Sequence, residues 1–254
     1  MATQRAVIVA DGDVDAATLE AAMTGTDGVP EARAARTVAA TLGPGGERGH
    51  DLPLLIGADG GARKAEALGW LPALVIGDAD SLAVADIERY RAMGIEIELH
   101  PAEKDESDLE LCIAAALARG AGEVRICGAL AGARVEHAAA NLLLMGHPML
   151  DGRNVALGHR GAWIRRIGTA QGAGSVELRG APTDYVSLLP LDPTVLGVTT
   201  DGLRYPLRGE PLSLGPTRGL SNELIADRAR VTCERGRLLV IQTPRSIETE
   251  AHRS

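Results

Sequence analysis

Short apolar runs alternate with helical patterns through the first half of the chain, and this alternation limits the possible folds more than any other feature. Five runs have the length and composition of strands: Ala6–Ala10, Leu54–Ala58, Leu74–Gly77, Ile95–Leu99 and Val124–Cys127. Between and after them lie segments with helical spacing of apolar residues: Ala62–Leu68, Val84–Met93, Asp108–Ala118 and Val135–Met145. A shorter helix is also predicted over Glu31–Leu42. Strand–helix alternation of this kind predicts a parallel sheet covered by helices on both faces.

The second half has a different pattern. From about Arg153, short apolar runs are separated by turn residues, and no helix of useful length interrupts them. Strands at this spacing predict a small antiparallel sandwich or barrel. We therefore predict an α/β domain over residues 1–150 and an antiparallel β domain over residues 151–254.

Composition excludes several functions. Aromatic residues make up only 2% of the 254 residues, which argues against platforms that stack nucleic-acid bases. The net charge of −8 and the lack of a Lys/Arg cluster argue against nucleic-acid binding in general. A Walker-type phosphate loop is excluded because the chain contains no Gly-Lys pair.

The same composition predicts a cytoplasmic protein that does not enter a membrane. No stretch approaches the roughly 20 apolar residues of a membrane span. Cys112, Cys127 and Cys233 have no metal-ligand or redox spacing, and each lies in an apolar context. We expect all three cysteines to fill the core.

Two carboxylates, Asp78 and Asp80, follow the apolar run Leu74–Gly77 directly. In open parallel sheets, ligands bind beyond the carboxyl ends of the strands. Extended residues two apart point the same way, so both carboxylates could converge on a hard cation such as Mg²⁺. The alternative is that Asp80 or Ser81 caps the helix that follows.

Two further clusters follow predicted strands. After Leu54–Ala58 come Asp59, Gly60 and Gly61, and paired glycines allow backbone N–H groups to approach a phosphate at a helix start. Gly pairs are also common in turns, so this signal alone is weak. After Ile95–Leu99 comes a segment rich in carboxylates.

In that segment, Ser107 and Glu110 have the spacing of a capping box. A capping box does not explain why Asp105, Glu106 and Asp108 crowd together beside it. Such density favours a shared metal ion.

The predicted strand Val124–Cys127 leads into Arg134, Glu136 and His137 at the start of a helix. A lone histidine is more often structural, whereas a guanidinium can grip phosphate oxygens. Acidic or glycine-rich segments after successive strands indicate metal-assisted phosphoryl chemistry on a nucleotide or a phosphate ester.

These motifs, in this order, resemble those of the thiamine pyrophosphokinase family. The segment ADGGARKAEALGWLPALVIGDADSL resembles the family's D-G-G segment and its G-D-x-D-S signature. DESDLELC is similar to its D-x-T-D helix start, and GALAGARVEHAAANLLLM to its G-A-x-G-G-R-x-D-H helix. DYVSLLPL, GVTTDGLRYPL and GLSNEL resemble three segments of its second domain. The resemblance spans roughly residues 54–242.

The resemblance implies a Rossmann-like α/β domain followed by a β-sandwich, in a homodimer with substrate sites at the subunit interface. It implies transfer of a pyrophosphoryl group from ATP to thiamine, giving thiamine diphosphate and AMP. Mg²⁺ would be held by Asp78, Asp80 and Asp108. Asp59, Gly60, Gly61, Ser81, Asp105 and Ser107 would line the ATP site.

The resemblance also assigns residues to the chemistry and to the second substrate. Arg134 and Glu136 match positions near the reacting groups, and Ser221 and Asn222 match the thiamine pocket. Three positions depart from the family pattern. Glu136 stands where the family has Asp, Ala133 replaces a Gly, and Ala79 fills a slot often held by a bulkier residue.

Two other functions remain open from the residues. One is a phosphatase that forms an aspartyl-phosphate on D-x-D, although that motif usually follows the first strand of its domain. The other is a thiamine or nucleotide sensor without turnover.

Overall fold

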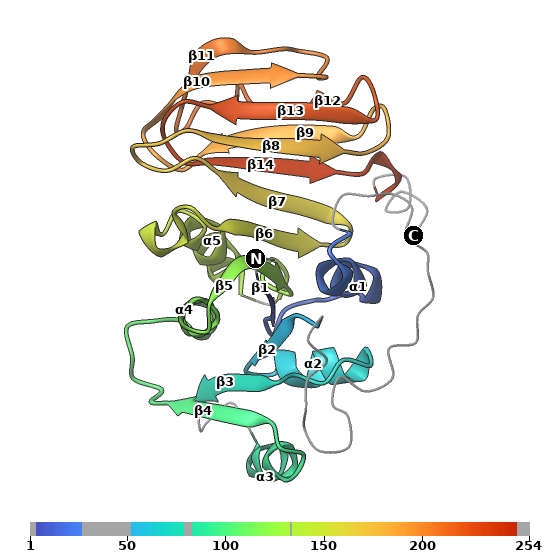
Figure 1. Ribbon diagram of the computed structural model, residues 1–254, viewed down its shortest axis with the longest axis vertical. Helices are drawn as coiled ribbons and strands as arrows, with labels where there is room; N and C mark the ends of the chain where they lie inside the picture. The colour runs from blue at the N-terminus through green and yellow to red at the C-terminus, as the bar shows by residue number, and fades with distance from the viewer. Residues whose placement is uncertain (1–3, 27–51, 79–82, 133, 248–254) are drawn as a thin grey trace. The chain divides into compact units, whose positions relative to one another are not determined.

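The structure, a computed structural model, describes residues 4–26, 52–78, 83–132 and 134–247 (Figure 1). The described chain forms two compact units: residues 4–25, 52–78, 83–132 and 134–141 belong to the first, and residues 26 and 142–247 to the second. The predicted domain boundary near residue 150 stays a prediction. The predicted helix over Glu31–Leu42 lies outside the described residues.

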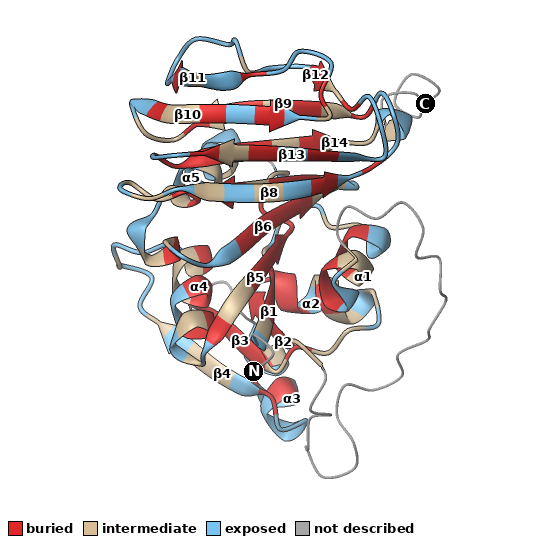
Figure 2. Ribbon diagram, turned by 45° about the horizontal axis from the view of Figure 1, so that its top comes forward, coloured by how far each residue is buried: buried red, intermediate tan, exposed pale blue. Residues whose placement is uncertain are grey.

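The first unit is built on a parallel sheet, as predicted. Its strands run in the order β5-β1-β2-β3-β4, and every neighbouring pair is parallel. The strands are β1 (Gln4–Val9), β2 (Leu54–Ala58), β3 (Leu74–Asp78), β4 (Glu96–His100) and β5 (Ala121–Cys127). The inner strands are almost wholly buried, because helices cover both faces of a parallel sheet (Figure 2).

The helices of this unit lie where strand–helix alternation requires. They are α1 (Ala16–Thr24), α2 (Gly61–Ala67), α3 (Val84–Ala92), α4 (Asp108–Ala118) and α5 (Val135–Leu144). Helix α4 lies on one face of the sheet, and α1 and α2 lie on the other (Figure 1). Helix α1 was not among the predicted helices, although both of its ends carry ordinary signals. Asp15 caps its first turn by accepting from the Thr18 N–H at 2.8 Å, and Gly25 ends it with a φ of 76°.

The strand order creates a reversal beside β1. The chain proceeds outward from β1 through β2 and β3 to β4, and then returns past them to form β5 on the other side of β1. The carboxyl ends of β1 and β5 therefore lie side by side where the strand order reverses. Open α/β sheets bind ligands at such a point.

The second unit is a two-sheet sandwich, which settles the choice between sandwich and barrel. One sheet has the order β12-β9-β14-β7-β6 and the other β11-β10-β13-β8, with antiparallel pairing throughout. A short 3₁₀ helix, η1 (Pro148–Leu150), precedes them. The strands are β6 (Asn154–His159), β7 (Ala162–Ile167), β8 (Gly174–Arg179), β9 (Tyr185–Pro190), β10 (Thr194–Asp201), β11 (Arg208–Ser213), β12 (Asn222–Glu223), β13 (Arg228–Cys233) and β14 (Leu238–Thr243).

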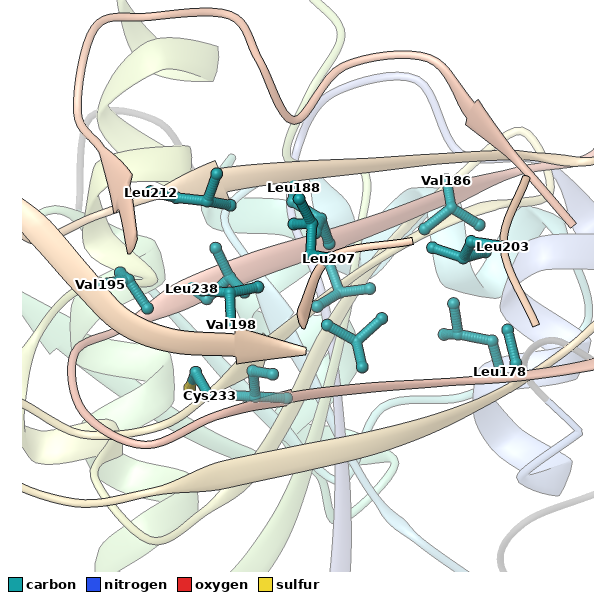
Figure 3. Close-up of a cluster of buried hydrophobic side chains, with 14 of the residues drawn as sticks. Leu178, Val186, Leu188, Val195, Val198, Leu203, Leu207, Leu212, Cys233 and Leu238 are labelled. Carbon is teal, nitrogen blue, oxygen red and sulfur yellow. The ribbon is translucent and has the colours of Figure 1, made fainter. Parts of the chain in front are cut away.

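The sandwich core is made of aliphatic side chains from both sheets (Figure 3). In β9 and β13, alternate residues are buried, as expected when one face of each sheet packs inward. Cys233 is part of this cluster. Cys112 and Cys127 are also buried and unbridged, which confirms that all three cysteines are core residues.

No helix in the described ranges is long and apolar enough to cross a membrane.

Candidate active site

A cavity of about 380 Å³ opens at the reversal of the first unit's sheet. Its walls are the loops after β1, β2 and β5 and the first turns of α4 and α5. The lining residues are Ala10, Asp11, Gly12, Ala58, Asp59, Ser107, Asp108, Leu109, Gly128, Ala129, Ala131, Gly132, Arg134, His137, Ala138 and Asn141. Four of the residues predicted for the site, Asp59, Ser107, Asp108 and Arg134, are therefore brought to one cavity.

The loop after β1 was not predicted as part of the site, yet it forms one wall. Its backbone is tied to the loop after β5, because the Gly12 N–H donates to the Gly128 carbonyl at 2.8 Å. A Cβ on Gly12 would lie 2.0 Å from the Ala131 oxygen, so no larger residue fits. The sequence signal was present: Asp11 and Gly12 follow an apolar strand in the same way as Asp59 and Gly60.

Lys64 holds this loop from helix α2. Its ammonium donates to the carbonyls of Asp11 and Gly12, the latter at 2.8 Å, and lies 3.1 Å from Asp11 Oδ1. One side chain thus neutralises a carboxylate and satisfies two carbonyls at the end of β1. Lys64 fixes the shape of the cavity wall.

Gly60 and Gly61 lie at the start of α2, as predicted, and packing explains both. A Cβ on Gly60 would lie 2.3 Å from Asp11 Oδ1, and one on Gly61 would lie 2.0 Å from the Val9 carbonyl. The glycines allow α2 to approach β1 closely. Asp59, directly before them, has a φ of 48°, a left-handed conformation that Asp tolerates better than most residues.

Asp108 lies on the first turn of α4, with its Oδ1 atom buried. The Lys104 ammonium is 3.0 Å from Oδ1, but the two groups are not aligned for a hydrogen bond. Burial alone would lower the pKa of Lys104, but Asp108 raises it above its usual value, with smaller contributions from the charges of Asp78 and Asp59. All three carboxylates are therefore near enough for their charges to act on Lys104.

The other residues of this segment have separate roles. The Ser107 side chain caps α4 by accepting from the Glu110 N–H at 3.2 Å, which confirms the predicted cap on that side. Asp105 is exposed on the preceding loop and does not line the cavity. Ser107 combines the structural role with a place in the cavity wall.

Asp78 ends β3 at the carboxyl edge, opposite His100 of β4. Asp80 and Ser81 lie outside the described residues. The N-cap position of α3 is held by Ala83, with no side-chain hydrogen bond. The alternative in which Asp80 or Ser81 caps this helix falls on residues outside the described ranges and stays a prediction.

The donor set suits a hard cation only in part. Asp59, Asp78 and Asp108 supply carboxylate oxygens, and Asp108 Oδ1 is a buried acceptor that receives no hydrogen bond. In the described ranges, however, no three Asp, Glu, His or Cys residues converge closely enough to form a complete metal site. The residues fit a metal that also draws ligands from elsewhere, such as water or substrate oxygens.

Arg134 and Glu136 form an exposed ion pair at the start of α5, with 2.7 Å between Arg134 Nε and Glu136 Oε1. This hydrogen bond is the main reason that the pKa of Glu136 is lowered. Arg134 lines the cavity, whereas Glu136 does not. His137 also lines the cavity, although a structural role was expected for it.

Asn141, one turn further along α5, was not predicted and also lines the cavity. Its side-chain amide donates to the Ala129 carbonyl at 2.8 Å, which ties α5 to the loop after β5.

The two residues predicted for thiamine lie in the second unit. Ser221 is exposed, has a φ of 56°, and its N–H donates to Ser187 Oγ at 3.0 Å. Asn222 is buried, and its side chain bonds to backbone groups of Tyr205 and Glu223. Asn222 thus shapes the backbone here, while Ser221 is open to solvent.

Comparisons with known proteins assign both units to one family. The model described as "Thiamin pyrophosphokinase, catalytic domain" matches residues 50–157, and "Thiamin pyrophosphokinase, vitamin B1 binding domain" matches residues 175–238. The thiamine pyrophosphokinase of Bacillus subtilis is 27% identical over 190 residues, which cover 75% of this chain and 87% of that protein.

Solved structures of the family share the fold. The Bacillus subtilis enzyme has a TM-score of 0.72 at 24% identity, covering 95% of this chain and 100% of its own. A thiamin pyrophosphokinase family protein from Enterococcus faecalis has a TM-score of 0.67 at 25% identity, covering 94% and 99%. With both domain models matched in order, over more than half of its length, the chain belongs to the thiamin pyrophosphokinase family.

Proposed function

We propose that the protein transfers the pyrophosphoryl group of ATP to the hydroxyl oxygen of thiamine. A bond forms between the thiamine oxygen and the β-phosphorus of ATP. The bond between that phosphorus and the oxygen bridging to the α-phosphorus breaks, and AMP leaves with this oxygen. The observation that carries this proposal is the match of both domain models, one for each half of the reaction. The cavity at the sheet reversal supports it, because that is where α/β sheets bind nucleotides.

ATP would bind in the cavity of the first unit. Arg134 is exposed there and can grip phosphate oxygens with its guanidinium. The wall held by Lys64 fixes the backbone that faces the ligand. Asp59 and Ser107 complete the lining, and Gly60, Gly61, Ser81 and Asp105 are assigned to the same site by family resemblance alone.

Mg²⁺ would be held by Asp78 and Asp108 together with Asp80. When bound, it would neutralise charge on the phosphate oxygens. The chain's own part is to hold acidic groups at fixed strand and helix ends, so that little reorganisation is needed when substrate arrives. A nearby carboxylate would accept the proton of the thiamine hydroxyl.

Thiamine would contact the second unit at Ser221. This residue is exposed, and its left-handed backbone presents it on the turn before β12. Asn222 would act on the same pocket by holding the neighbouring backbone at Tyr205.

We also propose a homodimer in the cytoplasm. None of the residues of α5 is buried, although most of them are apolar, and Val135 and Leu143 are 81% and 71% exposed. Burial of this surface against a second copy would remove apolar area from water. Three unbridged cysteines suit a reducing compartment. Equilibrium sedimentation tests the dimer, and a monomer at micromolar concentration would contradict it.

The test of function is an assay with thiamine, ATP and Mg²⁺ on purified protein. We expect AMP to appear only when thiamine is present, and its rate to fall by about a thousandfold in Asp108→Asn. Asp86→Asn is the matched control, because Asp86 is on α3 and pairs with Arg63 away from the cavity. A wild-type protein that binds both substrates without turnover would favour the sensor function.

A further inference from the structure

The chain contains only two lysines among its 26 Lys and Arg residues, and both lie at the acidic edge of the first unit's sheet. Lys64 is accounted for by the loop that it holds. Lys104 differs, because its ammonium lies against the Asp108 carboxylate and holds no loop among the described residues. Its side chain is nevertheless only 12% exposed, so it is held against the protein at some cost in conformational freedom.

The position of Lys104 is unfavourable for a cation unless negative charge surrounds it. It precedes the N-cap of α4, where the helix dipole favours anions. Partial burial also disfavours an ammonium, since its side chain is only 12% exposed. The Asp108 carboxylate, with its Oδ1 atom 3.0 Å from the ammonium, supplies the negative charge that offsets both effects.

Lys104 and Asp108 form a close, partly buried charge pair. Oδ1 of Asp108 is buried and accepts no aligned hydrogen bond, so the ammonium balances its charge without saturating it. A divalent cation that took this oxygen would have to displace the Lys104 ammonium from it. Without either cation, the buried oxygen would lack compensation, which is costly.

We propose that Lys104 is the resident counter-cation of this acidic site, pairing with Asp108 when no metal is bound and competing with the divalent metal for that carboxylate. The inference rests on the metal site of the proposed function. Lys104 therefore acts through Asp108 and is a positioning residue. It keeps the carboxylate in place between turnovers and weakens metal binding in the absence of substrate.

The test uses Lys104→Met, which keeps the length of the side chain and removes its charge, with Lys104→Arg as the charge-conserving control. Mn²⁺ is the probe, because it suits carboxylate sites and its free form is quantified by electron paramagnetic resonance. Binding is measured without ATP or thiamine. We expect Lys104→Met to bind Mn²⁺ about tenfold more tightly than wild type, since a nearby like charge has been removed. Lys104→Arg should stay within about twofold of wild type.

Thermal unfolding gives a second readout that needs no activity. In EDTA, Lys104→Met should unfold about 2–4 °C below wild type, and added Mn²⁺ should stabilise it more than wild type. Unchanged or weaker Mn²⁺ binding in a folded Lys104→Met, with wild-type binding intact, would overturn the inference alone. A wild-type protein that binds no Mn²⁺, with or without ATP, would overturn the metal site on which it rests.

Discussion

The Asn222 side chain closes a ring of hydrogen bonds with the backbone of Tyr205, which is 17 residues earlier in the chain. Its Oδ1 accepts from the Tyr205 N–H at 2.9 Å, and its Nδ2 donates to the Tyr205 carbonyl at 2.7 Å. The same Oδ1 accepts from the Glu223 N–H at 2.9 Å. A single buried amide thereby joins β12 to the segment that precedes β11.

Replacing this amide should destabilise the second unit. Asn222→Ala leaves two N–H groups and one carbonyl without partners, and we expect a loss of about 2–3 kcal/mol in the free energy of unfolding. Asn222→Asp keeps both acceptor bonds but points a buried carboxylate oxygen at the Tyr205 carbonyl, so it should also lose stability. Urea unfolding at constant m-value measures both, and equal stability of Asn222→Ala and wild type would refute the structural role.

Substitutions in the cavity wall test how tightly the loop after β1 is packed. Gly12→Ala would place a methyl group 2.0 Å from the Ala131 oxygen, and we expect a loss of about 1–3 kcal/mol in stability. Gly132→Ala is a matched control in the same cavity, because a methyl group there would have no described atom within 4 Å. Thermal unfolding compares the two, and similar melting temperatures would show that the loop is not constrained as described.

Asp151 joins two largely buried arginines in the second unit. It lies 3.0 Å from Arg237 Nη2 and also pairs with Arg166. Burial alone would raise the pKa of Asp151, but the hydrogen bonds of Arg237 and Arg166 lower it below 3.8. A carboxylate whose pKa is lower in the folded state stabilises the fold above pH 3.8, and this contribution disappears as the pH falls through the folded value.

We therefore expect Asp151→Asn to lose about 3 kcal/mol at pH 7, because the buried Arg166 guanidinium loses its carboxylate and Arg237 keeps only Asp192. Its stability should also fall less steeply than that of wild type below pH 4. Glu177→Gln is the control, since Glu177 pairs with Arg230 on the exposed surface and its removal should change nothing measurable. Urea midpoints measured at several pH values test this prediction. The same pH dependence of the midpoint in Asp151→Asn and wild type would contradict it.

Tyr90 should ionise far above the usual range. Burial is the main cause that raises its pKa to about 12, and a 3.0 Å hydrogen bond to Glu66 adds to it. The folded protein thus holds this proton more tightly than the unfolded chain, where the pKa is 10.0. The contribution to stability is present below pH 10 and is lost as the pH rises toward 12.

Absorbance at 295 nm should therefore show one of the three tyrosines titrating near pH 12, and Tyr90→Phe should abolish that step. The variant should also lose the extra decline in stability between pH 10 and pH 12. Three tyrosines that ionise together near pH 10 in the folded protein would rule out this environment.

Local patterns were sufficient to predict most of the fold. Alternating apolar runs and helical spacing predicted the parallel sheet, and Ser107 was predicted correctly as the cap of α4. Because parallel strands share one carboxyl edge, the same patterns placed Asp59, Asp78 and Asp108 on that edge. These features depend on periodicity and on residues close in sequence.

Features that depend on long-range pairing were missed. That the cavity lies beside β1 follows from the strand order, which no local pattern encodes, so Asp11 and Gly12 were overlooked. The hydrogen bonds of Asn222 to Tyr205 also depend on where β12 lies, and the role of Asn222 in thiamine binding stays a prediction. Lys104 could have been found, because it precedes Asp108 by one helical turn.

The central claim is pyrophosphoryl transfer, and the products of a single reaction test it most directly. Phosphorus NMR of protein incubated with ATP, thiamine and Mg²⁺ distinguishes transfer of two phosphoryl groups from transfer of one. We predict that thiamine diphosphate and AMP accumulate in equal amounts, and that Asp108→Asn forms both about a thousandfold more slowly. Accumulation of ADP with thiamine monophosphate, or of free phosphate without a thiamine ester, would contradict the account.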